Sequence, residues 1–209
     1  MVSLGGRMIK LSENELIYRF TEHKKWIDSL GKEGKRLNFD EIDLSQNNIE
    51  CEIYEQAYIT DCIFDNRDIK DISFYLSKLC SSSFKRCNLE KVDFTKADLS
   101  YTDFTNSILC DMNFNKCECI ETDFSNSQLS NIKLTDVLFD TVDLRNVIIQ
   151  NVDVSYSSFH EVLVKGISLK NVIGIEKINR LSINIGDIDK SVILYDIEAI
   201  QWLKNNIRD

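Results

Sequence analysis

Hydrophobic residues recur at every fifth position along most of the chain. From Phe39 to Leu169, all 27 positions at this spacing hold Phe, Leu, Ile, Val, Tyr or Cys. Two residues before each central position lies a second slot that is mostly small or β-branched, and the slot between them is often Asp or Asn. The segment KADLSYTDFTNS, residues 96 to 107, shows the unit. An internal repeat of this length predicts a solenoid of stacked units.

A period of five fits neither regular element. Side chains return to one face of a helix every 3.6 residues and to one face of a strand every second residue. The chain must therefore turn at regular intervals to keep both apolar slots inside. Each unit is expected to form one short extended side followed by a corner.

The unit resembles that of the pentapeptide-repeat family: a small residue, Asp or Asn, Leu or Phe, and two variable polar residues. The resemblance covers residues 37–173. It implies an all-β solenoid, a right-handed quadrilateral β-helix of about 27 repeats with four units in each coil. Equivalent residues of successive coils, four units apart in sequence, would then stack directly on one another.

Stacking of successive coils separates aromatic from aliphatic columns. One column runs through Phe64, Phe84, Phe104 and Phe124, and the next runs through aliphatic residues. Ten of the eleven phenylalanines occupy central positions. The core stack is predicted to contain Phe64, Phe74, Phe84, Phe94, Phe104, Phe114, Phe124, Leu89, Leu109 and Leu129.

The early coils are less regular than the later ones. Asn47, Glu52 and Arg67 occupy slots that are expected to be small and to point inward. Two explanations stay open: either the backbone deviates there, or these side chains lie at a capped end of the solenoid.

An open solenoid leaves unpaired strand edges at both ends, which must be covered. Residues 1–36 are predicted to supply a capping helix, because Ser12 and Glu15 have the spacing of a capping box and an apolar stripe then continues to Gly31. Residues 37–173 form the repeat region, and residues 174–209 form the second cap. We expect one structural domain overall.

The C-terminal cap begins where Gly174 interrupts the repeat. Residues 181–185 and 191–195 flank a Gly-Asp turn and predict a hairpin. Asp196 then opens a helix that carries Ile197, Ile200, Leu203 and Ile207 on one face, with Trp202 beside them. This helix is expected to cap the last coil. The family resemblance also suggests a homodimer through this end, with Ile197, Ile200, Trp202 and Leu203 as contact residues.

Composition limits the compartment and the partners. A net charge of -9 excludes a broad basic surface for nucleic acid. The seven cysteines form no CxxC pair, which argues against a disulfide framework or a zinc site. The sequence has no signal-peptide pattern and no long apolar segment. We expect a cytoplasmic protein that binds neither nucleic acid directly nor a membrane.

The residues do not assemble a recognisable catalytic or cofactor site. The two histidines, His23 and His160, are expected to lie far apart, and no nucleotide-binding glycine loop is present. Cys62, Cys87, Cys117 and Cys119 occupy inward slots. The sequence therefore predicts a protein that is not an enzyme and has no cofactor and no bound metal.

Three acidic residues share one column. Asp103, Asp123 and Asp143 occupy the same position of three successive coils and would form a line of negative charge on one face. One interpretation is a contact face for a basic partner, similar to a phosphate backbone. The other is that the carboxylates bond nearby backbone amides and stabilise corners, as Asp and Asn do in turns.

Two functions are consistent with these observations. The first is a non-catalytic, rigid module that binds or scaffolds another macromolecule. The second, implied by the family resemblance, is a DNA mimic that binds a type II topoisomerase, either DNA gyrase or topoisomerase IV, and modulates it or confers quinolone resistance. Salt distinguishes the two, because binding through exposed charges weakens with ionic strength and an apolar contact does not.

Overall fold

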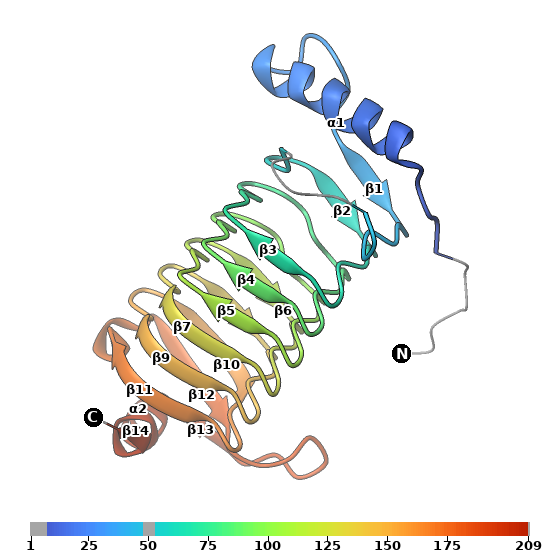
Figure 1. The fold of residues 1–209 in the computed structure, drawn as a ribbon. Helices are drawn as coiled ribbons and strands as arrows, with labels where there is room; N and C mark the ends of the chain where they lie inside the picture. Colours follow the sequence, from blue (N-terminus) through green and yellow to red (C-terminus); the bar gives the residue numbers. More distant parts are fainter. Residues whose placement is uncertain (1–7, 48–52, 209) are drawn as a thin grey trace.

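The protein is a β-solenoid of about seven turns with a helix at each end (Figure 1). The computed structural model describes residues 8–47 and 53–208. The coils stack along one axis, with the N-terminal helix over the first coil and the C-terminal helix at the opposite end. The right-handed twist and the quadrilateral cross-section stay predictions.

Most of the regular elements are short strands. The strands are β1 (Asn38–Asp40), β2 (Tyr58–Thr60), β3 (Asp68–Lys70), β4 (Asn88–Glu90), β5 (Ile108–Cys110), β6 (Glu118–Ile120), β7 (Gln128–Lys133), β8 (Leu138–Asp140), β9 (Ile148–Asp153), β10 (Ser158–Leu163), β11 (Ser168–Ile173), β12 (Arg180–Asn184), β13 (Ile193–Tyr195) and β14 (Ile207–Arg208). The helices are α1 (Glu13–Asp28), the 3-10 helix η1 (Ile175–Lys177) and α2 (Asp196–Asn206).

Stacked strands pair in parallel, each with the strand one coil away. Asn88 of β4 pairs with Ile108 of β5, which pairs with Gln128 of β7. The same offset continues through β9 and β11. Seven strands form one face in the order β14-β11-β9-β7-β5-β4-β3, and five form another in the order β13-β12-β10-β8-β6. The stacking of every fourth repeat unit, expected from the sequence, is therefore present.

The central positions of the repeat fill the interior. Every described position from Phe39 to Leu169 at the five-residue spacing is no more than 9% exposed, while Ile49 lies outside the described residues. The ten residues of the predicted core stack are all among them. Phenylalanines in one column stack nearly parallel, with centroid distances of 4.5 Å for Phe64 and Phe84 and 4.9 Å for Phe104 and Phe124. Such offset stacking adds to the energy of burial.

Each corner from Gln56 to Asn171 is made by a residue whose φ lies in the left-handed region. All 24 positions from Gln56 to Asn171 at the five-residue spacing have φ between 48° and 76°, and Gly166 is the one glycine among them. Asn and Asp adopt this conformation more readily than other non-glycine residues. At many corners the N–H of the next inward slot donates to the preceding central carbonyl, as Ser107 does to Phe104. A hydrogen-bonded turn with positive φ at its third residue has the pattern of a type II turn.

The inward slots complete the corner hydrogen bonds. Hydroxyl and thiol groups in these slots donate to the carbonyl oxygen of a central residue on the preceding coil. The donors are Ser77, Ser82, Cys87, Thr102, Ser107, Cys117, Thr122 and Ser157. Small residues with a hydroxyl or thiol at this slot therefore add hydrogen bonds to buried carbonyl groups, several of which also accept the N–H of their own turn.

Arg67 occupies an inward slot, and its Nε is buried with no hydrogen-bond partner among the described residues. Its side chain is half-buried, and Nη1 donates to the carbonyl oxygens of Leu44 at 2.8 Å and Asn47 at 2.6 Å. The guanidinium thus donates to backbone carbonyl groups of the preceding coil. Glu52 lies outside the described residues.

Helix α1 covers the first coil. Ser12 caps it by accepting a hydrogen bond from the Glu15 N–H at 3.3 Å. Phe20 is buried, and its ring packs edge-on against Phe39 at 5.7 Å and Tyr54 at 5.2 Å. Aromatic packing thus joins the helix to the end of the core stack.

The C-terminal cap departs from the repeat at Gly174, where φ is 85° and a Cβ would collide with Ser155. Strand β12 stacks on β10 with the register changed to Ser158 opposite Arg180, and β13 returns antiparallel to β12. Ile200, Trp202 and Leu203 of α2 pack against the core. The prediction that Ile197 shares their face is wrong, because its side chain is 77% exposed. Ile207 lies beyond the helix, in β14.

Candidate interaction surfaces

The acidic column lies where the sequence predicts it. The backbones of Asp103 and Asp123 form a parallel β-bridge, and so do those of Asp123 and Asp143. The two residues of each bridge lie one coil apart. All three side chains are half-buried. Each carboxylate also accepts a hydrogen bond from the backbone N–H two residues later, at 2.9 Å from Thr105, 2.7 Å from Ser125 and 2.9 Å from Arg145.

The same bond recurs along the repeat at polar slots that hold Asp or Asn. It is also made by Asp43, Asp93, Asp98, Asn113 and Asp153. A carboxylate that bonds the amide two residues ahead holds the chain in a turn. The corner-stabilising interpretation of these residues therefore has a specific contact at each of these positions.

Two of the three column aspartates are also paired with cations. Lys85 Nζ lies 2.9 Å from an oxygen of Asp103, and the Arg145 guanidinium donates to both oxygens of Asp143. Asp123 has no cationic partner within 4.0 Å in the described part of the chain. Burial, together with the neighbouring carboxylates Asp143 and Asp103, raises the pKa of Asp123. The column is thus neutralised at both ends and acidic in the middle.

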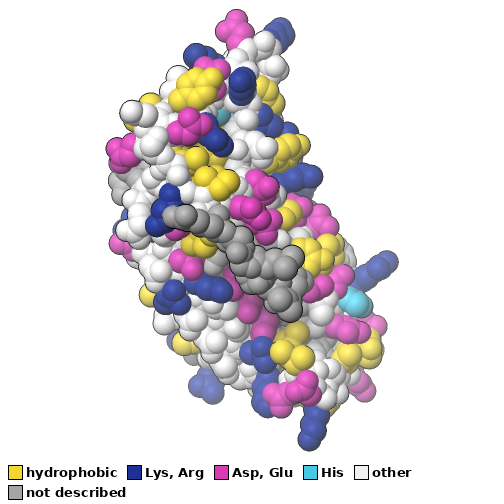
Figure 2. Space-filling view, turned by 90° about the vertical axis from the view of Figure 1, so that its right-hand side faces the viewer, with side chains coloured by type: hydrophobic (Ala, Val, Ile, Leu, Met, Phe, Trp, Pro, Cys, Tyr) yellow, Lys and Arg dark blue, Asp and Glu magenta, His cyan; other side chains and the backbone are white. Residues whose placement is uncertain are grey.

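Charge of both signs is spread over the surface. Figure 2 shows Lys and Arg side chains interspersed with Asp and Glu on one face, with single apolar residues between them. Salt bridges such as Lys70 with Glu90 at 2.8 Å lie across adjacent coils. A continuous acidic face of the kind that a nucleic-acid mimic presents is not seen in this view.

On the seven-stranded face, outward side chains of successive strands line up in one column. Ile108 and Ile148 are 47% and 50% exposed, and they flank Gln128 in one column of β5, β7 and β9. Nearby, an amide ladder follows the corner: Asn131 donates to Asp111, Asn151 to Asn131 and Asn171 to Asn151, each at 2.9 Å. This ladder was not predicted, although the sequence places three Asn residues at the same position of successive coils.

The four residues predicted as a contact at the C-terminal end divide into two groups. Ile200, Trp202 and Leu203 are half-buried against the last coils, and Ile197 points to solvent. Other apolar side chains at this end are also exposed, among them Ile188 at 63% and Tyr195 at 55%. Three of the four therefore act as cap contacts, while Ile197 belongs to the outer surface of the cap.

The two histidines lie in different surroundings. His160 is exposed, and its Nδ1 lies 3.0 Å from Asp140 Oδ1 on the preceding coil. His23 is fully buried on α1, where Nδ1 accepts the Leu37 N–H at 3.0 Å and Nε2 lies 3.0 Å from the Glu55 carbonyl oxygen. His23 therefore joins the cap helix to the first coils, a role that the sequence analysis missed.

Five thiols in the described part of the chain are poor nucleophiles, because burial raises their pKa. Cys62, Cys87, Cys117 and Cys119 are buried, and burial raises the pKa of Cys62 to about 12 and of Cys87 to about 11. Burial and the nearby Asp98 raise the pKa of half-buried Cys80 to about 12. Nucleophilic cysteines have a lowered pKa instead.

Over residues 8–47 and 53–208, no three His, Cys, Asp or Glu side chains are placed to hold a metal ion. No helix within these ranges is long and apolar enough to cross a membrane.

Comparison with known proteins identifies the repeat. A family model described as pentapeptide repeats matches eight copies, in residues 72–111 and 122–160. Together these two segments comprise 79 of the 209 residues, and over them the chain is similar to pentapeptide repeats. No curated protein sequence matches it.

Several solved structures of pentapeptide-repeat proteins are similar to parts of the chain. Rfr23 from the cyanobacterium Cyanothece 51142 is 15% identical over 56% of this chain and 90% of its own, with a TM-score of 0.45. HetL from Nostoc sp. strain PCC 7120, which is involved in heterocyst differentiation regulation, is 18% identical over 57% and 56%, with a TM-score of 0.32. Full-length QnrB1, a plasmid-mediated fluoroquinolone resistance protein, is 15% identical over 69% and 89%, with a TM-score of 0.27.

Proposed function

We propose that this protein is a non-catalytic module whose stiff outer faces bind another macromolecule, most simply a protein. The carrying observation is the stack of buried central residues with hydrogen-bonded corners over the described coils, which fixes the outer side chains in columns with one residue per coil. A surface that is already ordered loses little conformational entropy on binding. The seven-stranded face, with Ile108, Gln128 and Ile148 in register, is the contact surface that we favour.

The test is site-specific photo-crosslinking in cells. In one variant, a photoreactive phenylalanine analogue replaces Ile148 of β9. In a matched control, the same analogue replaces Tyr101, a corner residue that is 46% exposed. We expect Ile148 to give one discrete adduct that Tyr101 does not give. Equal, diffuse labelling from both positions would count against a specific contact on the seven-stranded face.

The second candidate is a DNA mimic that acts on DNA gyrase or topoisomerase IV. The stacked carboxylates of Asp103, Asp123 and Asp143 support it, and the ion pairs of Asp103 with Lys85 and Asp143 with Arg145 oppose it. Gyrase supercoiling, measured with and without a fluoroquinolone, separates the candidates. Inhibition or drug protection that disappears when all three residues become Asn would support mimicry, and no effect at micromolar protein would remove it.

The C-terminal end is proposed as a homodimer contact. Ile197, Tyr195 and Ile188 are exposed there and offer apolar surface beyond the cap. Sedimentation of the wild type and of Ile197→Asp tests the idea. A dimer that dissociates in the variant supports it, and a monomeric wild type at high micromolar concentration rejects it.

The protein is proposed to act in the cytosol. The six cysteines that the structure describes are all free thiols. Free thiols persist in reducing compartments. Fractionation of cells that express the tagged protein is the direct test, and recovery with secreted proteins would contradict the proposal.

A further inference from the structure

The aromatic columns end before the solenoid does. Phe124 is followed one coil later by Leu144 and then by Val164, and Phe114 is followed by Leu134 and then by Val154. The coils keep their circumference here, because β9 and β11 still pair at the same offset as the earlier strands. Phe139 and Phe159 enter a neighbouring column and offset only part of this loss of volume.

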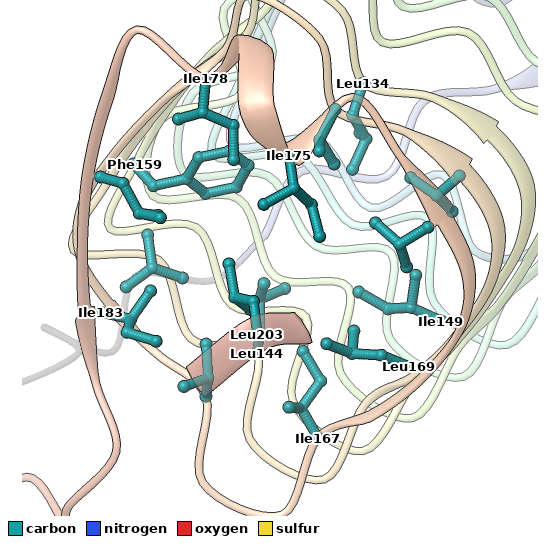
Figure 3. Close-up of a pocket in the computed structure, with 16 residues that line it drawn as sticks. Leu134, Leu144, Ile149, Phe159, Ile167, Leu169, Ile175, Ile178, Ile183 and Leu203 are labelled. Carbon is teal, nitrogen blue, oxygen red and sulfur yellow. The ribbon is translucent and has the colours of Figure 1, made fainter. Parts of the chain in front are cut away.

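A cavity remains at the C-terminal end of the core. It measures about 60 Å³, and all sixteen side chains that line it are aliphatic or phenylalanine. Ile175 and Ile178 approach from the segment around η1, and Leu203 approaches from α2 (Figure 3). The described walls supply no polar side chain for a trapped water to bond.

We propose that this cavity is a binding site for a small apolar molecule. Cavities lined only by aliphatic and aromatic side chains stay dry and accept apolar guests, and an engineered cavity of about 150 Å³ holds benzene or xenon. The present cavity is less than half that size, so its ligand class is a single apolar atom or a hydrocarbon of a few carbons.

The cap helix controls access to the site. Leu203 is half-buried over the cavity, and on the surface Lys204 Nζ of α2 lies 2.9 Å from Glu176 Oε1 of η1. A guest enters when α2 moves away from η1. Once seated, the guest contacts Leu203 and favours the docked position of α2.

Xenon is the probe, and the full-length protein is labelled at Ile, Leu and Val methyl groups for NMR. In the wild type, we expect saturable shifts at Val154, Val164 and Leu203, and no saturable shift at Val92, which is buried but does not line the cavity. Val154→Phe fills the cavity and should abolish the saturable shifts. Val192→Phe adds the same ring at a position that is 51% exposed and should retain them.

A smaller substitution, Val164→Leu, keeps the proposal testable if Val154→Phe does not fold. If Val154→Phe loses its circular dichroism signal, Val164→Leu replaces it and should require a higher xenon pressure for half-saturation. Wild-type shifts that grow linearly with pressure, and equally at Val92 and Val164, would overturn the proposal. So would unchanged saturable binding in a folded Val154→Phe or Val164→Leu protein.

Discussion

The Ser107 hydroxyl donates a hydrogen bond of 2.7 Å to the carbonyl oxygen of Phe84, which lies on the preceding coil. The same oxygen of Ser107 accepts the backbone N–H of Cys87 at 3.0 Å. One buried hydroxyl thus pairs a donor and an acceptor that face the core at a corner. Ser82 and Ser157 make the same double contact.

Replacing Ser107 by Ala should lower the free energy of unfolding by about 1 to 3 kcal/mol, because the Cys87 N–H and the Phe84 carbonyl each lose a buried hydrogen bond and keep only the 3.3 Å bond between them. Urea unfolding measures the change. Ser130→Ala on the outer face is the matched control and should stay within about 0.5 kcal/mol of the wild type. A Ser107→Ala protein as stable as the control would show that the corner is satisfied in another way.

Phe94→Ala should be among the most damaging core substitutions. The Phe94 ring lies 5.3 Å from the Phe74 ring and 5.2 Å from the Phe114 ring, measured between centroids. Removing a buried ring costs about 3 to 5 kcal/mol. Phe94→Leu keeps most of the volume and should cost less. A loss below about 1 kcal/mol for Phe94→Ala would mean that the neighbouring coils collapse into the space.

Filling the C-terminal cavity should stabilise the protein. At about 24 cal/mol per Å³, a void of about 60 Å³ costs about 1.4 kcal/mol, so Val154→Leu should recover up to that amount. Val137→Leu adds the same methylene in an inward slot that is 1% exposed and outside the cavity lining, where overpacking costs about 1 to 3 kcal/mol. Urea unfolding measures both changes. Equal changes in the free energy of unfolding for Val154→Leu and Val137→Leu would contradict the idea that only Val154 borders unfilled space.

The N-terminal cap should weaken in acid because of His23. Burial lowers the pKa of His23 below its ordinary value of 6.5. Below pH 6.5 the unfolded chain therefore binds a proton that the folded chain does not, and stability falls as the pH decreases towards the folded-state pKa. The protonated ring would also lose the acceptor that pairs the Leu37 N–H. The stability contributed by neutral His23 is fully present above pH 6.5.

The measurement is an NMR titration of the His23 ring protons, combined with urea unfolding at pH 7.5 and pH 5.5. His23→Leu removes the titrating group and should reduce the dependence of stability on pH, although it costs stability at both values. A His23 ring that titrates at or above pH 6.5 would refute the interpretation.

Much of the fold could be predicted because one inward position recurs without a break. The spacing of Phe64, Phe84 and Phe104 predicts both their burial and their stacking, since each depends on the period alone. The left-handed corners could not be predicted in the same way. Lys91, Lys96 and Tyr101 adopt positive φ because the stacked coil requires a corner there, and their own preferences oppose it.

The surface was harder to predict than the core. The column of Asp103, Asp123 and Asp143 followed from the period, but the Lys85 ion pair depends on the rotamer of a long side chain on the adjacent coil. Ile197 fits the helical stripe in sequence, yet the angle at which α2 docks turns it outward. The C-terminal cavity depends on how far side chains fill a closed space, which a hydrophobic pattern does not report.

The left-handed corners also bear on how the chain reaches its native state. The left-handed conformation costs a non-glycine residue roughly 1 to 2 kcal/mol, and it recurs at every fifth position from Gln56 to Asn171. A single coil that forms alone has this cost at each of its corners and has no adjacent coil with which to form hydrogen bonds. A coil added to an existing one gains its parallel hydrogen bonds at once. Assembly should therefore resemble the growth of a crystal from a seed, in which a slow first layer templates the rapid addition of the others.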